Sequence, residues 1–251
     1  MTLRFKLLTT ALLLLSNLSF AQDAIVSDRP GFTFSSTALG AKYFQYQGGL
    51  TFSSPGNTDI IAIENDFRYG VTDRLEVDVT LAYQSFSVPS LNANASGVSM
   101  LRLGTRYQIM SAPESGVDLT GVVQYDFLQL SDEVGETFNR LRVFGSLSYL
   151  DLGDKTSLNV NLGLSTVDVG MGQHVDPFYT INLGVSLSEK ASFYVEHFGE
   201  ENISVFNYGF TGGFSFLTSP RLQVDVFGGV VDNRFFTSTG FGSAGLSYRF
   251  N

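Results

Sequence analysis

The 251-residue sequence contains no cysteine and no tryptophan, and only 16% of its residues are charged. Without cysteine the chain has no disulfides, no thiolate metal ligands and no lipoprotein-type acyl attachment after a signal sequence. Basic residues are also scarce, with 15 lysines and arginines against 24 acidic residues. We expect no nucleic-acid partner, because phosphate binding needs clustered lysines and arginines.

Long apolar runs are missing as well, apart from a short stretch over residues 7–18 that follows two basic residues. Ser19-Phe20-Ala21 is then a small-x-small cleavage signal, which predicts a signal peptide over 1–21 and export by the general secretory route. A single transmembrane helix is the alternative. The run is shorter than the ~20 residues that such a helix needs, and no stop-transfer flank follows it.

After about residue 41, apolar and polar residues alternate with a period of two, as in strands with one apolar face. Between Leu75 and Tyr83, for example, every odd-numbered residue is apolar, and these residues alternate with Glu76, Asp78 and Thr80. Most such stretches have the ~9–11 residues that a tilted strand needs to cross a bilayer. We expect twelve strands, at 41–53, 58–70, 74–87, 98–110, 117–130, 137–150, 155–166, 177–188, 190–198, 204–217, 220–231 and 238–250.

The connections between these stretches alternate between tight turns and mostly longer segments. This succession is typical of short periplasmic turns and longer external loops, with both termini in the periplasm. The longer segments, taken as external loops, are 54–57, 88–97, 131–136, 167–176, 199–203 and 232–237. The first of them, at four residues, is an exception in being short.

A soluble β-sandwich also alternates polar and apolar residues, and it is the main alternative fold. Two features favour a membrane barrel: ionisable residues at mid-strand on the polar face, and tyrosines on the apolar face, most of them toward strand ends. Such rings fit the water–lipid interface. They are Tyr69, Tyr83, Tyr107, Tyr125, Tyr149, Tyr208 and Tyr248.

The sequence ends in an amphipathic strand that closes on Phe250 and Asn251. This ending is similar to the terminal signal that the barrel assembly machinery of the outer membrane reads. We therefore expect an all-β fold: a transmembrane antiparallel up-and-down β-barrel of about 12 strands, over 41–251, in outer-membrane lipid of a Gram-negative-type cell. A sheet in hydrocarbon must close on itself, because unpaired backbone groups are costly there. No polar break marks a subunit contact, so we expect a monomer.

Three motifs carry a resemblance to a known family. The opening Asp28-Arg29-Pro30-Gly31-Phe32-Thr33 is similar to a D-R-P-x-F-T pattern, and residues 67–77 contain an R-Y-G-x-T-D-R-L-E hairpin. Residues 194–199 resemble a strand that carries a Tyr-x-Glu element. On these motifs the chain resembles the transporter-like family named for the MetA pathway of phenol degradation. The resemblance implies an outer-membrane barrel for the passage of small, often aromatic or apolar, compounds; Gly31 stands where an acidic residue is usual.

Ionisable residues on the polar face are the candidate site, since that face would line the lumen. A turn at 71–73 would bring Arg68 near Glu76 and Asp66 near Asp78. Two interpretations remain open: a salt-bridge lattice that rigidifies and seals the barrel, or opposed charges that orient polar solutes in a constriction. The candidates are Glu64, Asp66, Arg68, Glu76, Asp78, Arg102, Arg106, Asp126, Arg140, Arg142, Glu196 and Asp225.

The segment 22–40 precedes the first strand and lacks clean alternation. We consider it a candidate lumen plug entering from the periplasmic side, built around Asp28, Arg29 and Pro30, with Arg29 meeting the acidic cluster. A flexible tail or a capping strand at the rim is the alternative. A few inward phenylalanines could line a route for apolar solutes, namely Phe86, Phe138, Phe144, Phe198 and Phe227.

Enzymatic and metal-dependent functions have little support. A hydrolase on the barrel surface would need a histidine with a serine partner, and only His174 and His197 are available. Ser204 could be imagined as that partner, but no nucleophile motif surrounds it. Two isolated histidines do not form a metal site, and we expect no cofactor. We therefore expect a passive channel or facilitator for a small-molecule solute, with a sealed structural or surface barrel as the alternative.

Overall fold

The computed structural model describes residues 25–112, 116–134, 138–149, 152, 155–168, 173–202, 205–233 and 236–250. The expected signal peptide over 1–21 and Ser204 lie outside these ranges. The strands are β1 (Phe44–Ser53), β2 (Asp59–Gly70), β3 (Leu75–Val88), β4 (Ala93–Ala112), β5 (Val117–Leu128), β6 (Phe138–Tyr149), β7 (Thr156–Asp168), β8 (Gln173–Ser186), β9 (Ala191–Asn202), β10 (Val205–Ser219), β11 (Leu222–Asn233) and β12 (Phe236–Phe250). Two single-turn helices, η1 (Pro89–Leu91) and η2 (Asp132–Val134), lie in the connections β3–β4 and β5–β6.

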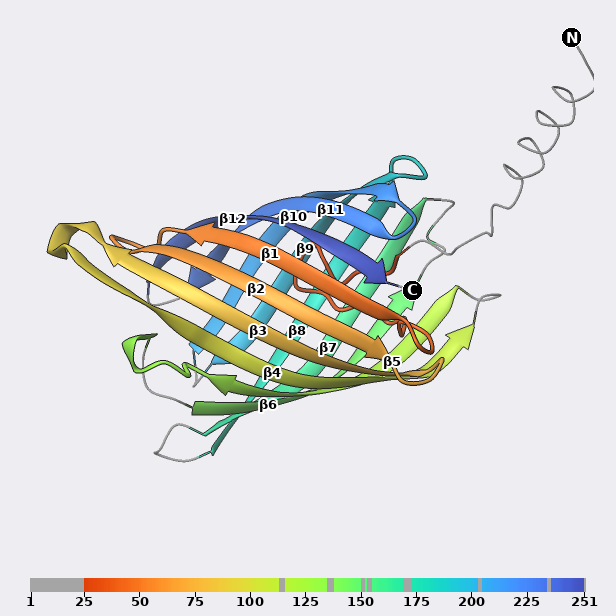
Figure 1. The fold of residues 1–251 in the computed structure, drawn as a ribbon, viewed down its shortest axis with the longest axis horizontal. Helices are drawn as coiled ribbons and strands as arrows, with labels where there is room; N and C mark the ends of the chain where they lie inside the picture. Colours follow the sequence, from red (N-terminus) through yellow and green to blue (C-terminus); the bar gives the residue numbers. More distant parts are fainter. Residues whose placement is uncertain are drawn as a thin grey trace, which may run out of the picture.

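The strands form one closed antiparallel barrel in which each strand pairs with its neighbours in sequence (Figure 1). Closure is made by β1 and β12, which pair over ten residues from Phe44↔Phe250 to Ser53↔Phe241. Closure matters because an open sheet would leave a row of unpaired backbone groups at each edge. The expected up-and-down barrel of twelve strands is confirmed.

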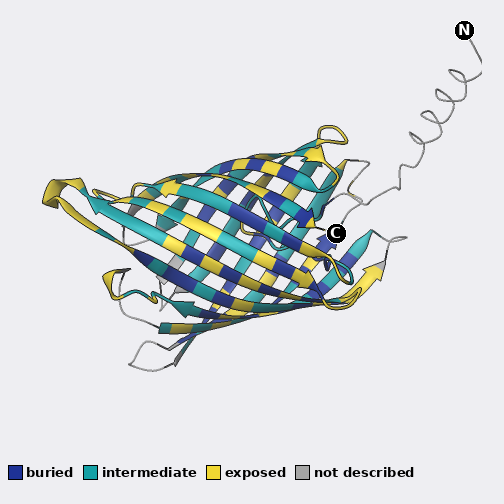
Figure 2. Ribbon diagram, in the orientation of Figure 1, coloured by how far each residue is buried: buried dark blue, intermediate teal, exposed yellow. Residues whose placement is uncertain are grey.

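Side chains of opposite character occupy the two faces of the wall. Arg68, Glu76 and Gln45 are fully buried inside, whereas Val79 and Leu103 are among the many apolar side chains exposed on the outside. Exposed and buried residues alternate along the strands (Figure 2), as the pleat of a strand requires. A polar interior under an apolar exterior is the reverse of a soluble sandwich, and it fits a barrel wall that faces lipid.

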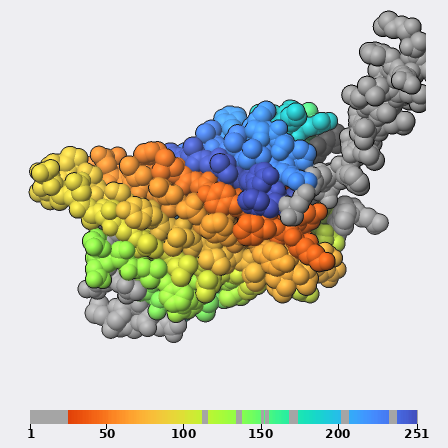
Figure 3. Space-filling view, in the orientation of Figure 1, coloured from red at the N-terminus to blue at the C-terminus, as the bar shows by residue number. Residues whose placement is uncertain are grey.

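The hairpin β3–β4 projects beyond the rest of the barrel at the end away from the C-terminal end of β12 (Figures 1 and 3). We expected a loop over 88–97, yet β4 begins at Ala93 and continues the ladder through Ser87↔Asn94 and Val88↔Ala93. The prediction was wrong because residues 92–97 are Asn, Ala, Ser and Gly, which show no alternation of large apolar and polar side chains. The hairpin is extended by backbone hydrogen bonds between β3 and β4, which need no such alternation.

Strand β8 likewise begins at Gln173, four residues before the expected position. His174, expected in a loop, lies within this strand opposite Val167 of β7. No helix among the described residues is long and apolar enough to span a membrane.

Candidate functional site

Residues 25–43, called the N-terminal segment below, run along the inner wall of the barrel before β1 begins. Hydrogen bonds or ion pairs join this segment to β1–β9, β11 and β12, and Ile25 binds Pro220 in the β10–β11 turn. Its end docks on β2, where Lys42 N donates to Gly70 O at 2.7 Å and Gly70 N donates to Tyr43 O at 2.9 Å. The segment therefore occupies the lumen near the end with the short turns, which is the periplasmic end in such barrels.

Asp28 is held by two arginines of the wall. Nη2 of Arg106 lies 2.6 Å from Oδ2 of Asp28, and Nη1 of Arg68 lies 3.4 Å from the same oxygen. Glu76 completes a balanced group of two acids and two bases, with Oε1 at 2.6 Å from Nε of Arg68. Burial opposes ionisation of Asp28, but the two guanidinium groups outweigh it and lower its pKa to about 2.

Arg29 points the other way, toward β11 and β12. Its Nη2 lies 2.9 Å from Oδ1 of Asp225. The guanidinium sits where Gly49 and Gly245 leave room, because a Cβ at either glycine would overlap it. We expected Arg29 to meet the acidic cluster of β2 and β3, and it pairs with Asp225 instead. Pro30 follows through a cis peptide bond.

Glu196 of β9 accepts hydrogen bonds from the N-terminal segment. Both of its carboxylate oxygens accept from Phe32 N, at 3.1 and 3.0 Å, and its other partners are the hydroxyls of Thr33 and Thr211. Gly31 has a φ of +105°, and a Cβ there would lie 3.1 Å from Oε2 of Glu196. An acidic residue at position 31, as in the resembled family, would bring a second carboxylate next to Glu196.

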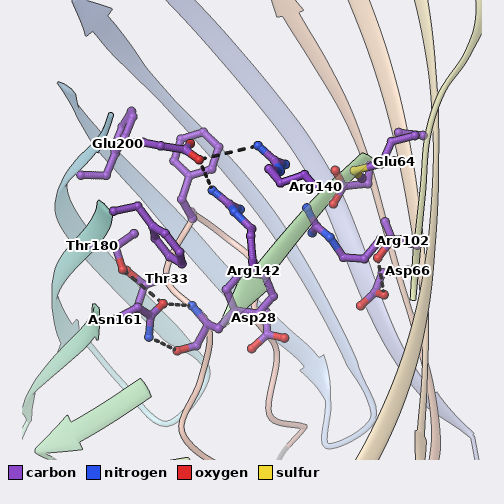
Figure 4. A pocket seen from close by; sticks show the side chains of 18 of the residues that line it. Asp28, Thr33, Glu64, Asp66, Arg102, Arg140, Arg142, Asn161, Thr180 and Glu200 are labelled. Atoms are coloured by element: carbon purple, nitrogen blue, oxygen red, sulfur yellow. Dashed lines mark hydrogen bonds and ion pairs between the residues drawn. The ribbon is translucent and has the colours of Figure 1, made fainter. Parts of the chain in front are cut away.

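A cavity of about 550 Å³ lies above the segment, on its external side. Asp28, Arg29 and Phe32 to Phe34 form part of its floor, and inward side chains of the strands form its walls (Figure 4). Of the twelve candidate residues, seven line this cavity: Glu64, Asp66, Asp78, Arg102, Arg106, Arg140 and Arg142. The other five are buried inside the barrel: Arg68, Glu76, Asp126, Glu196 and Asp225.

One wall carries a cluster of three arginines and two carboxylates, called the cationic cluster below. Asp126 lies 2.7 Å from Nε of Arg102 and 2.8 Å from Nη2 of Arg140. Glu200 lies 2.8 Å from Nη2 of Arg142 and 3.6 Å from Nη1 of Arg140. Figure 4 shows Glu200 bridging the two arginines of β6. Sequence reasoning missed Glu200, because it was placed in the connection 199–203 rather than on the inward face of β9.

The acids of β2 and β3 form the neighbouring part of the wall, called the acidic cluster: Glu64, Asp66 and Asp78. This cluster adjoins Arg102, because Thr80 of β3 pairs with Arg102 of β4. None of the three makes a salt bridge with another described residue, and Asp66 accepts a hydrogen bond from Thr80 at 2.9 Å. Arg68 lies near Glu76, as expected, with Nε 2.6 Å from Oε1. The directly paired residues are nevertheless different: Arg68 stands opposite Asp78, and Asp66 stands opposite Thr80.

Phenylalanines form the third element of the cavity. The Phe32 ring, 44% exposed, lies 4.8 Å from the Phe198 ring and 6.3 Å from the Phe227 ring, centroid to centroid. Phe138 and Phe178 also line the cavity, whereas Phe144 is buried between Phe34 and Phe178. Phe86 of the projecting hairpin is not among the lining residues. Sequence reasoning missed Phe32, Phe34 and Phe178; the parity of β8 could have identified the last.

The two histidines do not meet. His197 faces outward on β9, where Nδ1 lies 3.2 Å from Tyr179 Oη and the ring packs on Phe210. Among the described residues no group of three histidine, aspartate or glutamate side chains could hold a metal ion.

The barrel is similar to solved bacterial porins and to an autotransporter domain. The KdgM porin in complex with disordered oligogalacturonate aligns with 83% of this chain and 99% of its own, at 9% identity and a TM-score of 0.59. The NanC porin aligns with 82% and 98%, at 10% identity and a TM-score of 0.56. The translocator domain of the autotransporter NalP from Neisseria meningitidis aligns with 96% and 95%, at 14% identity and a TM-score of 0.52.

At these identities the similarity concerns the fold alone. No family model matches the sequence, and no curated protein is detectably similar to it. The resemblance to the family named for the MetA pathway is therefore not confirmed. The comparisons do show that this arrangement of strands is one that porins use.

Proposed function

We propose that this protein is a monomeric outer-membrane channel through which small solutes pass without a covalent step, and that the N-terminal segment is its gate. The observation that carries the proposal is the cavity of about 550 Å³ inside the barrel, with the cationic and acidic clusters side by side on its wall. Fixed charges of both signs around a narrow passage orient and select polar solutes. The apolar exterior supports a place in the outer membrane.

The contacts of the segment support its role as a gate. It closes the periplasmic side of the cavity through residues Asp28 to Phe34, so a solute in the cavity cannot continue until the segment moves. The segment is held by many separate hydrogen bonds and ion pairs, and its Phe32 and Phe34 rings pack on phenylalanines of the wall. Each neutral hydrogen bond contributes only about 1 kcal/mol net, because water replaces the lost partner, so stepwise release is feasible.

The phenylalanine rings support small aromatic or apolar compounds as solutes, which is also what the sequence resemblance implies. The porin with bound oligogalacturonate points instead to acidic sugars. A sealed structural barrel is the second candidate function. It is favoured by the balanced, buried group of Asp28, Arg68, Glu76 and Arg106, which rigidifies the lumen.

The test is single-channel conductance of the refolded mature chain in a planar bilayer. We expect rare, small openings of the wild type, a large steady conductance after deletion of residues 22–40, and frequent openings of Arg106→Ala. The control is Arg74→Ala, which removes the same charge at an exposed turn and should behave like the wild type. Silence of all variants, with the barrel shown to be folded by heat-modifiable gel migration, would overturn the channel and leave the sealed barrel.

A further inference from the structure

The cationic cluster holds one more positive than negative charge. Arg102 and Arg140 share Asp126, and Arg140 and Arg142 share Glu200, so three guanidinium groups face two carboxylates. Within the described structure Arg142 uses Nη2 for its ion pair, and its buried Nε has no hydrogen-bond partner. A buried cation with spare donors is stabilised by a further anionic acceptor, because charge-assisted hydrogen bonds are among the strongest in proteins.

Apolar surface lies directly beside this excess charge. The guanidinium carbon of Arg142 is 4.5 Å from the centroid of the Phe178 ring. Phe198 stands two residues before Glu200 on the same face of β9 and packs on the exposed ring of Phe32. A solute that reaches the arginines therefore lies against phenylalanine rings. Where a solute touches these rings, a sugar hydroxyl would lose its water without gaining a hydrogen-bond partner.

The acidic cluster on β2 and β3, beside Arg102 of β4, restricts how an anion can lie. Glu64, Asp66 and Asp78 carry no salt bridge to another described residue, and they repel a carboxylate placed near β2 and β3. Attraction on one side and repulsion on the other give a single favourable orientation of the solute. The charged group then faces β6 and the apolar body faces the floor.

We propose that the cavity is a specific binding site for a small apolar carboxylate, such as a benzoate-type acid. Its carboxylate binds Arg142 and Arg140, and its ring packs on Phe198 and Phe32. The proposal rests on the proposed channel in one respect only: it names the solute class of that channel. Binding itself requires no passage, so the two proposals can fail separately.

The experiment is isothermal titration of the refolded mature barrel in detergent, with empty micelles subtracted. The probes are benzoate, benzamide and galacturonate. We expect saturable binding of benzoate and binding weaker by about tenfold or more for benzamide, which lacks the charge. Galacturonate should also bind more weakly than benzoate. Equal binding of benzoate and benzamide would overturn the role of the arginines, and tighter binding of galacturonate would overturn the apolar part of the site.

Two substitutions in one ion pair distinguish a role in ligand binding from a role in barrel stability alone. Arg142→Gln should weaken benzoate binding about tenfold or more, whereas Glu200→Gln should strengthen it, because it releases two guanidinium groups for the ligand. A purely structural pair would make both variants shift in the same direction, which would overturn the proposal. Arg74→Gln, at an exposed turn outside the cavity, is the control and should bind benzoate like the wild type. If Arg142→Gln fails to fold, Arg142→Lys should bind benzoate with intermediate affinity, because lysine keeps the charge but not the fork.

The outcome also distinguishes the site from the channel. A barrel that stays silent in the bilayer but binds benzoate with opposite shifts in the two variants would have a ligand site without transport. Open pores with no saturable benzoate binding would support the channel proposal and overturn the proposed binding site.

Discussion

Arg29 and Asp225 stand 196 positions apart in the chain, and their side chains meet at 2.9 Å inside the barrel. The pair joins the N-terminal segment to β11, and Ser243 of β12 accepts a further hydrogen bond from the same guanidinium. The carboxylate of Asp225 is fully buried. Gly49 and Gly245 provide the space for the arginine. Asp28 pairs with Arg68 of β2 and Arg106 of β4, so two consecutive residues fasten the segment to two different parts of the barrel wall.

Loss of Arg29 should loosen the segment. Arg29→Ala leaves the buried Asp225 carboxylate without its partner, and removing one member of such a pair costs about 3–5 kcal/mol. We expect more frequent openings in the bilayer than for the wild type. The double variant Arg29→Ala/Asp225→Asn should show a smaller effect, because no unpaired charge remains. Unchanged openings in both variants would show that this pair does not hold the gate.

The N-terminal segment can also be loosened while the charges of Arg29 and Asp225 are both kept. Gly49→Ala puts a Cβ where the guanidinium of Arg29 lies, and should displace it. We expect openings similar to those of Arg29→Ala. The control is Gly145→Ala, a strand glycine whose Cβ would meet no atom within 4 Å. A closed Gly49→Ala channel would mean that the arginine can shift without releasing the segment.

Acid should release the segment through Asp28. Its pKa is lowered to about 2 in the docked state, against an ordinary value of 3.8, so docking is stabilised above the ordinary value by about 2 kcal/mol. This contribution decreases as the pH falls below 3.8 and is lost near 2. We therefore expect the contribution of Asp28 to docking to stay constant from neutral pH to about pH 5, and the open probability to rise at lower pH as that contribution is lost.

The control for this titration is Asp28→Asn, which has no proton to gain at position 28. It should show more openings at neutral pH and a flatter acid response. An acid response as steep as that of the wild type would assign the pH dependence to other carboxylates of the lumen.

Position 31 should tolerate only glycine. Its φ of +105° costs an L-residue about 1–3 kcal/mol, and a Cβ would press on Tyr194 and Glu196 at 3.1 Å. Gly31→Ala should reduce the hydrogen-exchange protection of Phe32 N, which donates to Glu196, and Gly31→Asp should reduce it further through carboxylate repulsion. Gly56→Ala is the matched control, with a positive φ of +61° and open space around it. Full protection of Phe32 N in Gly31→Asp would refute this account.

The lipid-facing band should respond to charge according to depth. Val79→Arg places a cation near the middle of β3 and should destabilise the folded barrel by about 2–4 kcal/mol. Leu75→Arg, on the same face at the end beside the short turn, should cost about 0–1 kcal/mol. Urea unfolding of the barrels in lipid vesicles measures both. Equal costs would indicate that β3 does not cross the bilayer along this stretch.

The barrel itself could be predicted from the sequence, because its signals are local. The pleat of a strand sends successive side chains to opposite faces, so Glu76, Asp78 and Thr80 were assigned to one face from spacing alone. Tyrosines at strand ends and polar residues at mid-strand then favoured a membrane barrel over a sandwich. The proximity of Arg68 to Glu76 also followed from the short turn between their strands.

Partners across the lumen could not be predicted in this way. The course of residues 25–43 has no period, and the segment is placed by bonds to strands that lie far away in sequence, such as Arg29 to Asp225. Glu200 acquires its role only when β9 continues to residue 202 and closure of the barrel brings it to Arg142. The alternation of residues along a strand determines which face a side chain occupies. The closed barrel, with the segment inside it, determines what that side chain meets, since those contacts depend on distances across a space that no local pattern encodes.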